Sequence, residues 1–396
     1  MYRIINGKIV LENSVLDGYD LIIKNDKIFK ITNRPRDYKY KIIDAKGGYV
    51  TPGFIDIHAD YIEHMAAPRP SSLMDFKIAI HEAERELISH GITTMYHSLS
   101  LYKPKSKGIK PIREPANVKK FVELISKVKN EQRQIHHRLH LRYEIDNIEG
   151  FESVKEYAEK NKVDLLSIMD HSPGQGQYRN LIRYKKMLKS YGRIETEEEA
   201  DKIIMERQNS EKASLTMLKK LAEVAKSNNI PMASHDDDTI EKLKTVKDLG
   251  AKISEFPITL EVAKKAKELG FYTVAGAPNV LLGRSTSGNL SAIDGIKSNC
   301  IDILSSDYYP AGMLHAVYKL FKTLGYELHE AMRLVTINPA EAIGIDKSTG
   351  SIQEGKIADI LIINELDDGM PAITSAFVAG NYLFSSFYRG IKNGAN

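Results

Sequence analysis

The chain has 396 residues, 56 lysines and arginines against 52 aspartates and glutamates, and 42% hydrophobic residues, which is typical of a globular protein. A formal net charge of +4, spread along the chain, argues against a nucleic-acid binder with a dedicated basic face. The single cysteine, Cys300, excludes an intramolecular disulfide and a cysteine-rich zinc module, so a bound metal would need histidine and carboxylate ligands.

Length and hydropathy set further expectations. Domains commonly run to about 100–200 residues and single α/β barrels to about 250, so we expect one large domain and one smaller one. No apolar run approaches the ~20 residues that cross a bilayer, and the first residues do not resemble a signal peptide. We therefore expect a cytoplasmic protein with neither a membrane nor a nucleic acid as partner.

Both ends of the chain read as short strands separated by turns. Such runs occupy residues 2–10, 20–31 and 41–50 at the start, and 356–364 and 372–387 at the end. Neither end has enough strands to bury a core by itself. We expect residues 1–50 and 345–396 to combine into one small composite β-sandwich.

Residues 51–344 alternate short β-rich runs with longer helical stretches, which is typical of βα units around a parallel sheet. Eight such units favour an α/β fold of the (β/α)₈ TIM-barrel type, with a doubly wound open sheet as the alternative. The expected strands are 54–60, 92–99, 137–145, 163–171, 230–236, 251–257, 271–279 and 301–307. The expected helices are 76–90, 116–133, 151–161, 196–228, 239–249, 259–269 and 327–343.

The longest interruption of this pattern, residues 172–229, is highly charged. It is too long for an ordinary connection, so it either contains its own helices or forms a lid, for which 173–216 is the candidate segment.

Ionisable residues recur where the expected strands end, which is where barrel enzymes keep their reacting groups. His58 and Asp60 alternate, so on a strand they would share a face like two ligands of one metal. The others that would converge there are Glu144, His171, His235 and Asp307. Each alone has a plainer interpretation as a hydrogen-bonded histidine or a helix N-cap, and Asp236 to Asp238 fit a cap. Together, unpaired carboxylates would repel one another unless cations neutralise them.

A second group of residues suits an anionic substrate. The glycine-rich stretch 276–292 follows the seventh run, where barrels often bind phosphate through backbone N–H groups; a surface loop is the alternative. Arg142 shares a face with Glu144, and guanidinium groups suit phosphate oxygens. The candidate substrate-binding residues are Arg69, Arg142, Gln177, Asn279, Gly283, Ser287, Asn289 and Tyr309.

Three longer motifs resemble a known family. TPGFIDIHAD (51–60), TINPAEAIGI (336–345) and GSIQEGKIADILII (350–363) look like the amidohydrolase superfamily, whose metal-dependent hydrolases have a (β/α)₈ barrel and a composite β-sandwich. Eight shorter motifs, among them LHLRYE, DHSPGQGQY, SHDDDT and SSDYYP, are similar to its phosphonate-metabolism branch. That resemblance implies release of pyrophosphate from α-D-ribose 1-methylphosphonate 5-triphosphate, a small phosphorylated sugar, by a homo-oligomer.

The resemblance also implies roles for individual residues. One or two divalent ions are expected, zinc first, with manganese or iron as alternatives. The implied ligands are His58, Asp60, Glu144 as a bridging carboxylate, His171, His235 and Asp307, which is also the general base. Glu255 is the alternative to His171 as a ligand.

One motif departs from the branch. Where its members read RGGSHSGN, this chain reads LGRSTSGN, with Leu282, Arg284 and Thr286 at the altered positions. Two alternatives therefore stay open: hydrolysis of a cyclic amide, N-acyl or other C–N substrate by the same metal centre, and a non-catalytic subunit of a phosphonate-processing complex.

Overall fold

The computed structural model describes residues 1–35, 39–69, 72–103, 111–190, 194–285 and 288–389, and its centre is a parallel sheet of eight strands. The strands pair in chain order, and the last returns to the first: Asp307 N donates to His58 O (3.0 Å) and Asp60 N donates to Asp307 O (2.7 Å). The strands are β8 (Phe54–Ala59), β9 (Ile92–Leu101), β10 (His136–Glu144), β11 (Leu165–Met169), β12 (Met232–His235), β13 (Ile253–Glu255), β14 (Tyr272–Gly276) and β15 (Ile303–Ser305). The predicted TIM-type barrel is confirmed, with a strand in each of the eight expected runs.

These strands are apolar along most of their length because both of their faces are covered. On the inside, Ile57, Leu165 and Ile253 belong to one buried cluster that fills the barrel. On the outside, Met95 and Leu139 belong to the larger cluster between the sheet and the helices. Several strands have polar side chains at their carboxyl ends, at the mouth of the barrel, among them His58, Glu144, His235 and Glu255.

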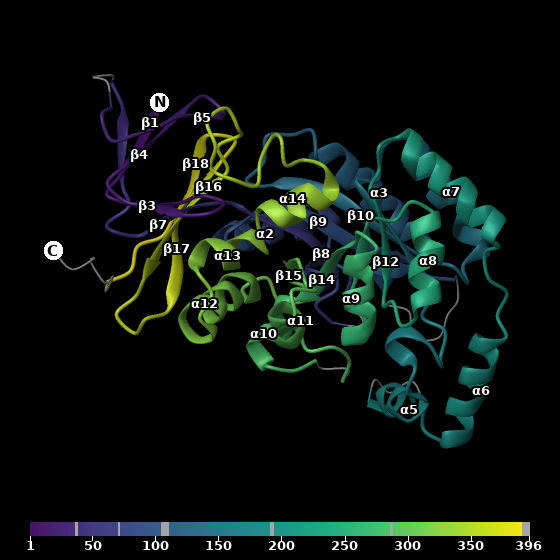
Figure 1. Cartoon of the computed structure of the whole chain (residues 1–396). Coiled ribbons are helices and arrows are strands. Elements are labelled where there is room, and N and C mark those ends of the chain that lie inside the picture. The colour runs from purple at the N-terminus through teal and green to yellow at the C-terminus, as the bar shows by residue number, and fades with distance from the viewer. Residues whose placement is uncertain (36–38, 70–71, 104–110, 191–193, 286–287, 390–396) are drawn as a thin grey trace.

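Helices surround the sheet (Figure 1). They are α1 (Tyr61–Ala66), α2 (Phe76–Ser89), α3 (Pro115–Val128), α4 (Phe151–Glu159), α7 (Leu215–Ser227), α8 (Ile240–Asp248), α9 (Leu260–Glu268), α10 (Ala277–Leu282), α11 (Ala292–Lys297), α12 (Gly312–Leu324), α13 (Leu328–Arg333) and α14 (Ile337–Ile343). The helix expected over 327–343 is two helices, because Pro339 fits only the first turn of a new one. The helix α12 was not among those expected.

The two ends of the chain meet in a separate pair of sheets, drawn in purple and yellow at one end of the molecule in Figure 1. One sheet contains β1 (Tyr2–Ile5), β4 (Asp20–Lys24), β5 (Lys27–Thr32) and β6 (Lys41–Asp44). The other joins β2 (Lys8–Val10), β3 (Val15–Leu16) and β7 (Tyr49–Pro52) to β16 (Ile360–Glu365), β17 (Pro371–Val378) and β18 (Asn381–Ser385). Ile4 and Ile23 share a buried cluster with Ile360 and Phe377, so the predicted composite sandwich is confirmed. The exact boundaries, 50/51 and 344/345, stay a prediction.

The charged interruption contains its own helices, α5 (Leu181–Ser190) and α6 (Glu197–Gln208), which lie together beyond the barrel in Figure 1. They form a small core of their own around Tyr184 and Leu188. Arg183 of α5 lies against Gly288 in the glycine-rich stretch, where an added Cβ would come within 1.5 Å of the guanidinium. The segment thus touches the loop after β14, and its role as a lid stays a prediction.

Candidate metal centre at the barrel mouth

Three strands end in an unusual backbone conformation at the mouth. Asp236 after β12, Phe256 after β13 and Asp307 after β15 all have positive φ, between 53° and 59°. Such a conformation costs about 1–3 kcal/mol for a residue other than glycine and clusters at functional sites. Here it turns the chain sharply beside the polar strand ends, and the Phe256 ring packs against the rings of His58 and His235.

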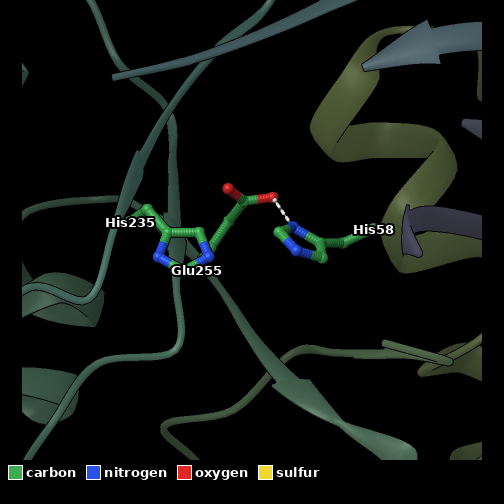
Figure 2. Close-up of side chains that lie close together, drawn as sticks. All are labelled: His58, His235 and Glu255. Atoms are coloured by element: carbon green, nitrogen blue, oxygen red, sulfur yellow. Dashed lines mark hydrogen bonds and ion pairs between the residues drawn. The ribbon is translucent and has the colours of Figure 1, made fainter. Parts of the chain in front are cut away.

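Three buried residues, His58, His235 and Glu255, form the first candidate group of metal ligands. One ligand atom from each lies within 4.8 Å of the others. Figure 2 shows the Glu255 carboxylate turned toward the His58 ring, where His58 Nδ1 and Glu255 Oε1 lie 2.8 Å apart. Burial raises the pKa of the Glu255 carboxyl, but the neighbouring imidazoles of His58 and His140 outweigh it and hold that pKa well below its usual range.

A second group contains His171, His235 and Asp236, again within 4.8 Å, so the two groups share His235. His171 Nδ1 contacts Glu144, and His171 Nε2 lies 3.3 Å from Asp236 Oδ2. Burial lowers the pKa of His171, but Glu144 and Asp236 overcome this and raise it well above its usual value. The carboxylates of Glu144 and Asp236 thus lie against the imidazoles of His171 and His235, and negative charge is concentrated between them.

Two buried polar atoms indicate that this site fits a cation. His235 Nδ1 and Asp236 Oδ2 lie 3.1 Å apart, as in an ion pair, yet neither has a hydrogen-bond partner within the described residues. Buried polar groups are normally satisfied, so such a pair needs an explanation. Nitrogen and carboxylate donors without thiolate suit zinc, manganese or iron. The residues present fit a divalent metal.

Asp60 lies beside this centre and contacts two arginines. Its Oδ1 accepts from Arg142 Nη1 (2.6 Å) and its Oδ2 from Arg113 Nη2 (3.1 Å). Arg113 also donates from Nε to Glu63 Oε1 (2.7 Å). Asp60 belongs to neither group of candidate ligands within the described residues, and its role as a ligand stays a prediction.

Asp307 lies at the seam where the barrel closes. Burial raises the pKa of its carboxyl to about 6, against the opposing charge of His58. The carboxylate is near Gly276 at the end of β14, where an added Cβ would be 3.5 Å from Asp307 Oδ2. Asp307 and Glu144 also lie outside both groups of candidate ligands among the described residues, so their predicted ligand roles are untested.

The residues predicted to bind substrate differ in their exposure and in their local contacts. Asn279 of α10 stabilises the loop that follows this helix. Its side chain donates a hydrogen bond to Leu290 O and accepts one from Ala292 N. Gly283 ends α10 with a left-handed conformation at φ 70°. Arg142 is buried beside Asp60; Arg69, Gln177 and Tyr309 are exposed; Asn289 is half-buried; and Ser287 lies outside the described residues.

The three consecutive aspartates after β12 do not cap the next helix. The N-cap of α8 is Thr239, which accepts from Lys242 N, so the cap interpretation is wrong. Asp237 accepts from Ser234 and Ser254, and Asp238 accepts from Gly176 N. Asp236 is thereby left facing the two histidines. The sequence analysis also missed Arg113, which no motif marks.

Comparisons with known proteins show the family to which most of the chain is similar. Residues 49–383 match the model of the amidohydrolase family. The α-D-ribose 1-methylphosphonate 5-triphosphate diphosphatase of Escherichia coli (strain K12) is 31% identical over 92% of this chain and 95% of its own. Adenine deaminase 4 of Rhizobium meliloti (strain 1021) is 40% identical over 17% of this chain and 11% of its own.

Solved structures support the fold. The N-acetylglucosamine-6-phosphate deacetylase of Pasteurella multocida superposes with a TM-score of 0.62 at 14% identity, over 97% of this chain and 100% of that one. A D-hydantoinase gives a TM-score of 0.62 at 16% identity, over 96% and 94%. Among the described residues, no helix is both long and apolar enough to span a membrane.

Proposed function

Because this chain belongs to the amidohydrolase family and is a hydrolase of that superfamily, we propose that it releases pyrophosphate from α-D-ribose 1-methylphosphonate 5-triphosphate. The observation that carries the proposal is the extent of the likeness to the Escherichia coli diphosphatase, 92% of this chain and 95% of that one. A match of that extent takes in the barrel and continues into the terminal sheets. The deaminase match, over 17% of this chain, supports a shared family but no substrate.

We propose that His58, His235 and Glu255 hold a divalent metal, and that His171 and Asp236 hold a second ion or complete the shell of the first. When bound, such an ion supplies a Lewis acid that lowers the pKa of water and offsets phosphoryl charge. His235 belongs to both groups, so it is the side chain on which either arrangement depends.

Asp307 is the proposed general base. Its carboxyl has a pKa near 6 through burial, so at neutral pH it is mostly ionised and able to take a proton from the attacking water. A base with a pKa close to the working pH is the most efficient kind. Its place beside His58 at the barrel seam keeps it at the mouth and next to the candidate ligands.

Arg142 and Arg113 are the proposed sources of positive charge for the substrate. Both are held at the mouth by Asp60, and Arg113 is also held by Glu63. Charge-assisted hydrogen bonds from guanidinium groups suit phosphoryl oxygens. The glycine-rich stretch after β14, with Gly283 and Asn289, is proposed to bind the far end of the same substrate.

The test measures pyrophosphate and phosphate release from ribose 1-methylphosphonate 5-triphosphate and from ATP, with protein of known zinc or manganese content. Preferential release of pyrophosphate from the phosphonate sugar is the expected result. Arg142→Ala should raise KM for this substrate, whereas a matched change at the exposed Arg85, which pairs with Glu82 on α2, should not. No turnover with metal bound would reject the proposal, and activity on cyclic amides unaffected by Arg142→Ala would favour a C–N hydrolase.

A further inference from the structure

A chain of polar side chains crosses the inside of the barrel next to His58 and Glu255. Ser98 Oγ lies 3.1 Å from His140 Nδ1, and His140 Nε2 lies 2.6 Å from Ser167 Oγ. Ser167 Oγ lies 2.6 Å from Glu255 Oε2, whose Oε1 contacts His58 Nδ1 at 2.8 Å. The chain runs from β9 through β10 and β11 to β13 and ends on β8, and all its side chains are buried.

The number of protons on each group decides which atom donates in each hydrogen bond between these side chains. An ionised carboxylate only accepts hydrogen bonds, so Ser167 gives its single hydroxyl proton to Glu255. His140 Nε2 must then donate to the Ser167 oxygen, because that hydroxyl has no second proton to offer. At the other end, Ser98 Oγ accepts from Ala59 N (3.1 Å) and has its own proton for His140 Nδ1.

The same reasoning shows which nitrogen of His58 donates a hydrogen bond. Glu255 Oε1 can only accept, so His58 Nδ1 carries the proton of the ring. When the ring is neutral, it has one donor and one acceptor nitrogen, and the bond to Glu255 then leaves the lone pair on His58 Nε2. A ring nitrogen needs a lone pair to bind a metal, and the bond made by the other nitrogen decides which one has it.

We propose that Ser167 and His140 are positioning residues of the metal centre. They hold the Glu255 carboxylate in place, and through it they keep His58 in the tautomer whose Nε2 is the ligand atom. The chain is buried throughout, so water does not compete for its hydrogen bonds. The inference rests on the proposed function only in taking His58 and Glu255 as metal ligands.

The first test is the tautomer itself. Metal-free protein is labelled with ¹⁵N-histidine, and the His58 signals are identified by their loss in His58→Asn. Burial lowers the pKa of His58, but Glu255 overcomes this effect and raises it, so the spectra are recorded at a pH where the ring is neutral. We expect that neutral ring to have a protonated Nδ1 and an unprotonated Nε2, and His140 to have a protonated Nε2. A neutral His58 ring with its proton on Nε2 would overturn the proposal, even if Ser167→Ala cannot be made.

The second test is zinc affinity, measured by competition with a chromophoric chelator. Ser167→Ala removes one donor and one acceptor from the chain, and losing an outer partner of a ligand typically weakens metal binding about 10–100-fold. Ser100→Ala is the matched control, because Ser100 is buried on β9 and its hydroxyl has no partner among the described residues. We expect the control to bind zinc as the unmodified protein does.

Equal affinity in Ser167→Ala and the unmodified protein, or an equal loss in both variants, would contradict a positioning role. Should Ser167→Ala not fold, the tautomer of His58 in the unmodified protein decides the matter. Neither test contains a substrate. A failure to hydrolyse the triphosphate would therefore reject the proposed function while leaving both results standing.

Discussion

The position of Asp60 between two arginines leads to a prediction that separates two roles for this residue. Asp60→Asn keeps the shape of the side chain but removes the charge that faces Arg142 Nη1 at 2.6 Å and Arg113 Nη2 at 3.1 Å. Arg113 retains Glu63 at 2.7 Å, so the main loss falls on Arg142, whose side chain is only 7% exposed. A buried charge without its counter-ion is strongly destabilised.

The size of the effect follows from this exposure. Breaking a fully buried ion pair costs about 3–5 kcal/mol, and a hydrogen bond to a charged group contributes about 1.5–3 kcal/mol. The Asp60 side chain is 25% exposed, so solvent screens part of the interaction and the lower end applies. We expect Asp60→Asn to lower the free energy of unfolding by about 3 kcal/mol and to leave the bound metal in place.

The assay is urea unfolding of the metal-free protein, followed by circular dichroism, with metal content measured separately. A double-mutant cycle between Asp60→Asn and Arg142→Met should give a clear coupling energy, because the two groups touch. Glu63→Gln is the control, since Glu63 contacts Arg113 and should not couple to Arg142. Loss of metal from Asp60→Asn, with unchanged apo stability and no coupling to Arg142, would refute this reasoning and make Asp60 a ligand.

Three further predictions concern the base, the metal and acid. Asp307→Asn should keep its metal but lose about 10²–10⁴ in kcat, and unimpaired turnover would remove Asp307 from the chemistry. Removing the metal with a chelator should lower stability by about 4 kcal/mol if the ion had been present at about 1,000 times its Kd, and an unchanged melting temperature would exclude a bound ion. Burial lowers the pKa of His97 and His137 below the usual 6.5, so the unfolded chain binds more protons below pH 6.5 and stability should fall as the pH drops from there. His97→Gln should flatten this dependence in urea titrations at pH 7.5 and 5.5, and an identical slope would show that other groups cause it.

Much of the fold could be predicted because the β-rich runs and the helical stretches are clearly separated in the sequence. The eight β-rich runs stand apart from the helices, and each proved to be a strand that is buried on both faces. Helix boundaries were harder where one amphipathic pattern continues across a break. The stretch 196–228 contains α6 and α7, and the second begins where Ser214 caps Met217 N.

The candidate site was predictable in its histidines but not in its pairings. His58, His171 and His235 were expected at the mouth, and the structure brings each into a group of possible ligands. The pairing of His58 with Asp60 as ligands of one metal was inferred from strand alternation, which holds only within a strand, and it stays a prediction. Because β8 ends at Ala59, Asp60 already stands at the N-cap position of α1, and its side chain turns to the arginines.

Other features depend on contacts between distant parts of the chain, which no local pattern encodes. Arg113 reaches Asp60 across 53 residues, and His58 meets Glu255 across 197. Glu255 could be named only as an alternative, because a carboxylate at a strand end looks the same whether it binds a metal or orients a histidine. Its partners in three dimensions, His58 at one oxygen and Ser167 at the other, come from distant strands and cannot be read from the local sequence.

The charges at the mouth connect the proposed cation with the proposed anionic substrate. The carboxylates of Glu144, Asp236 and Glu255 face histidines, whereas Asp60 has arginines as its partners. Imidazoles that serve as metal ligands are neutral, so these three carboxylates would then be unbalanced and would repel a triphosphate. A divalent ion supplies the missing positive charge, which means that metal has to bind before such a substrate can. The proposed activity therefore requires the apparent affinity for the triphosphate to rise with metal occupancy, while hydrolysis of a neutral amide would not impose that order.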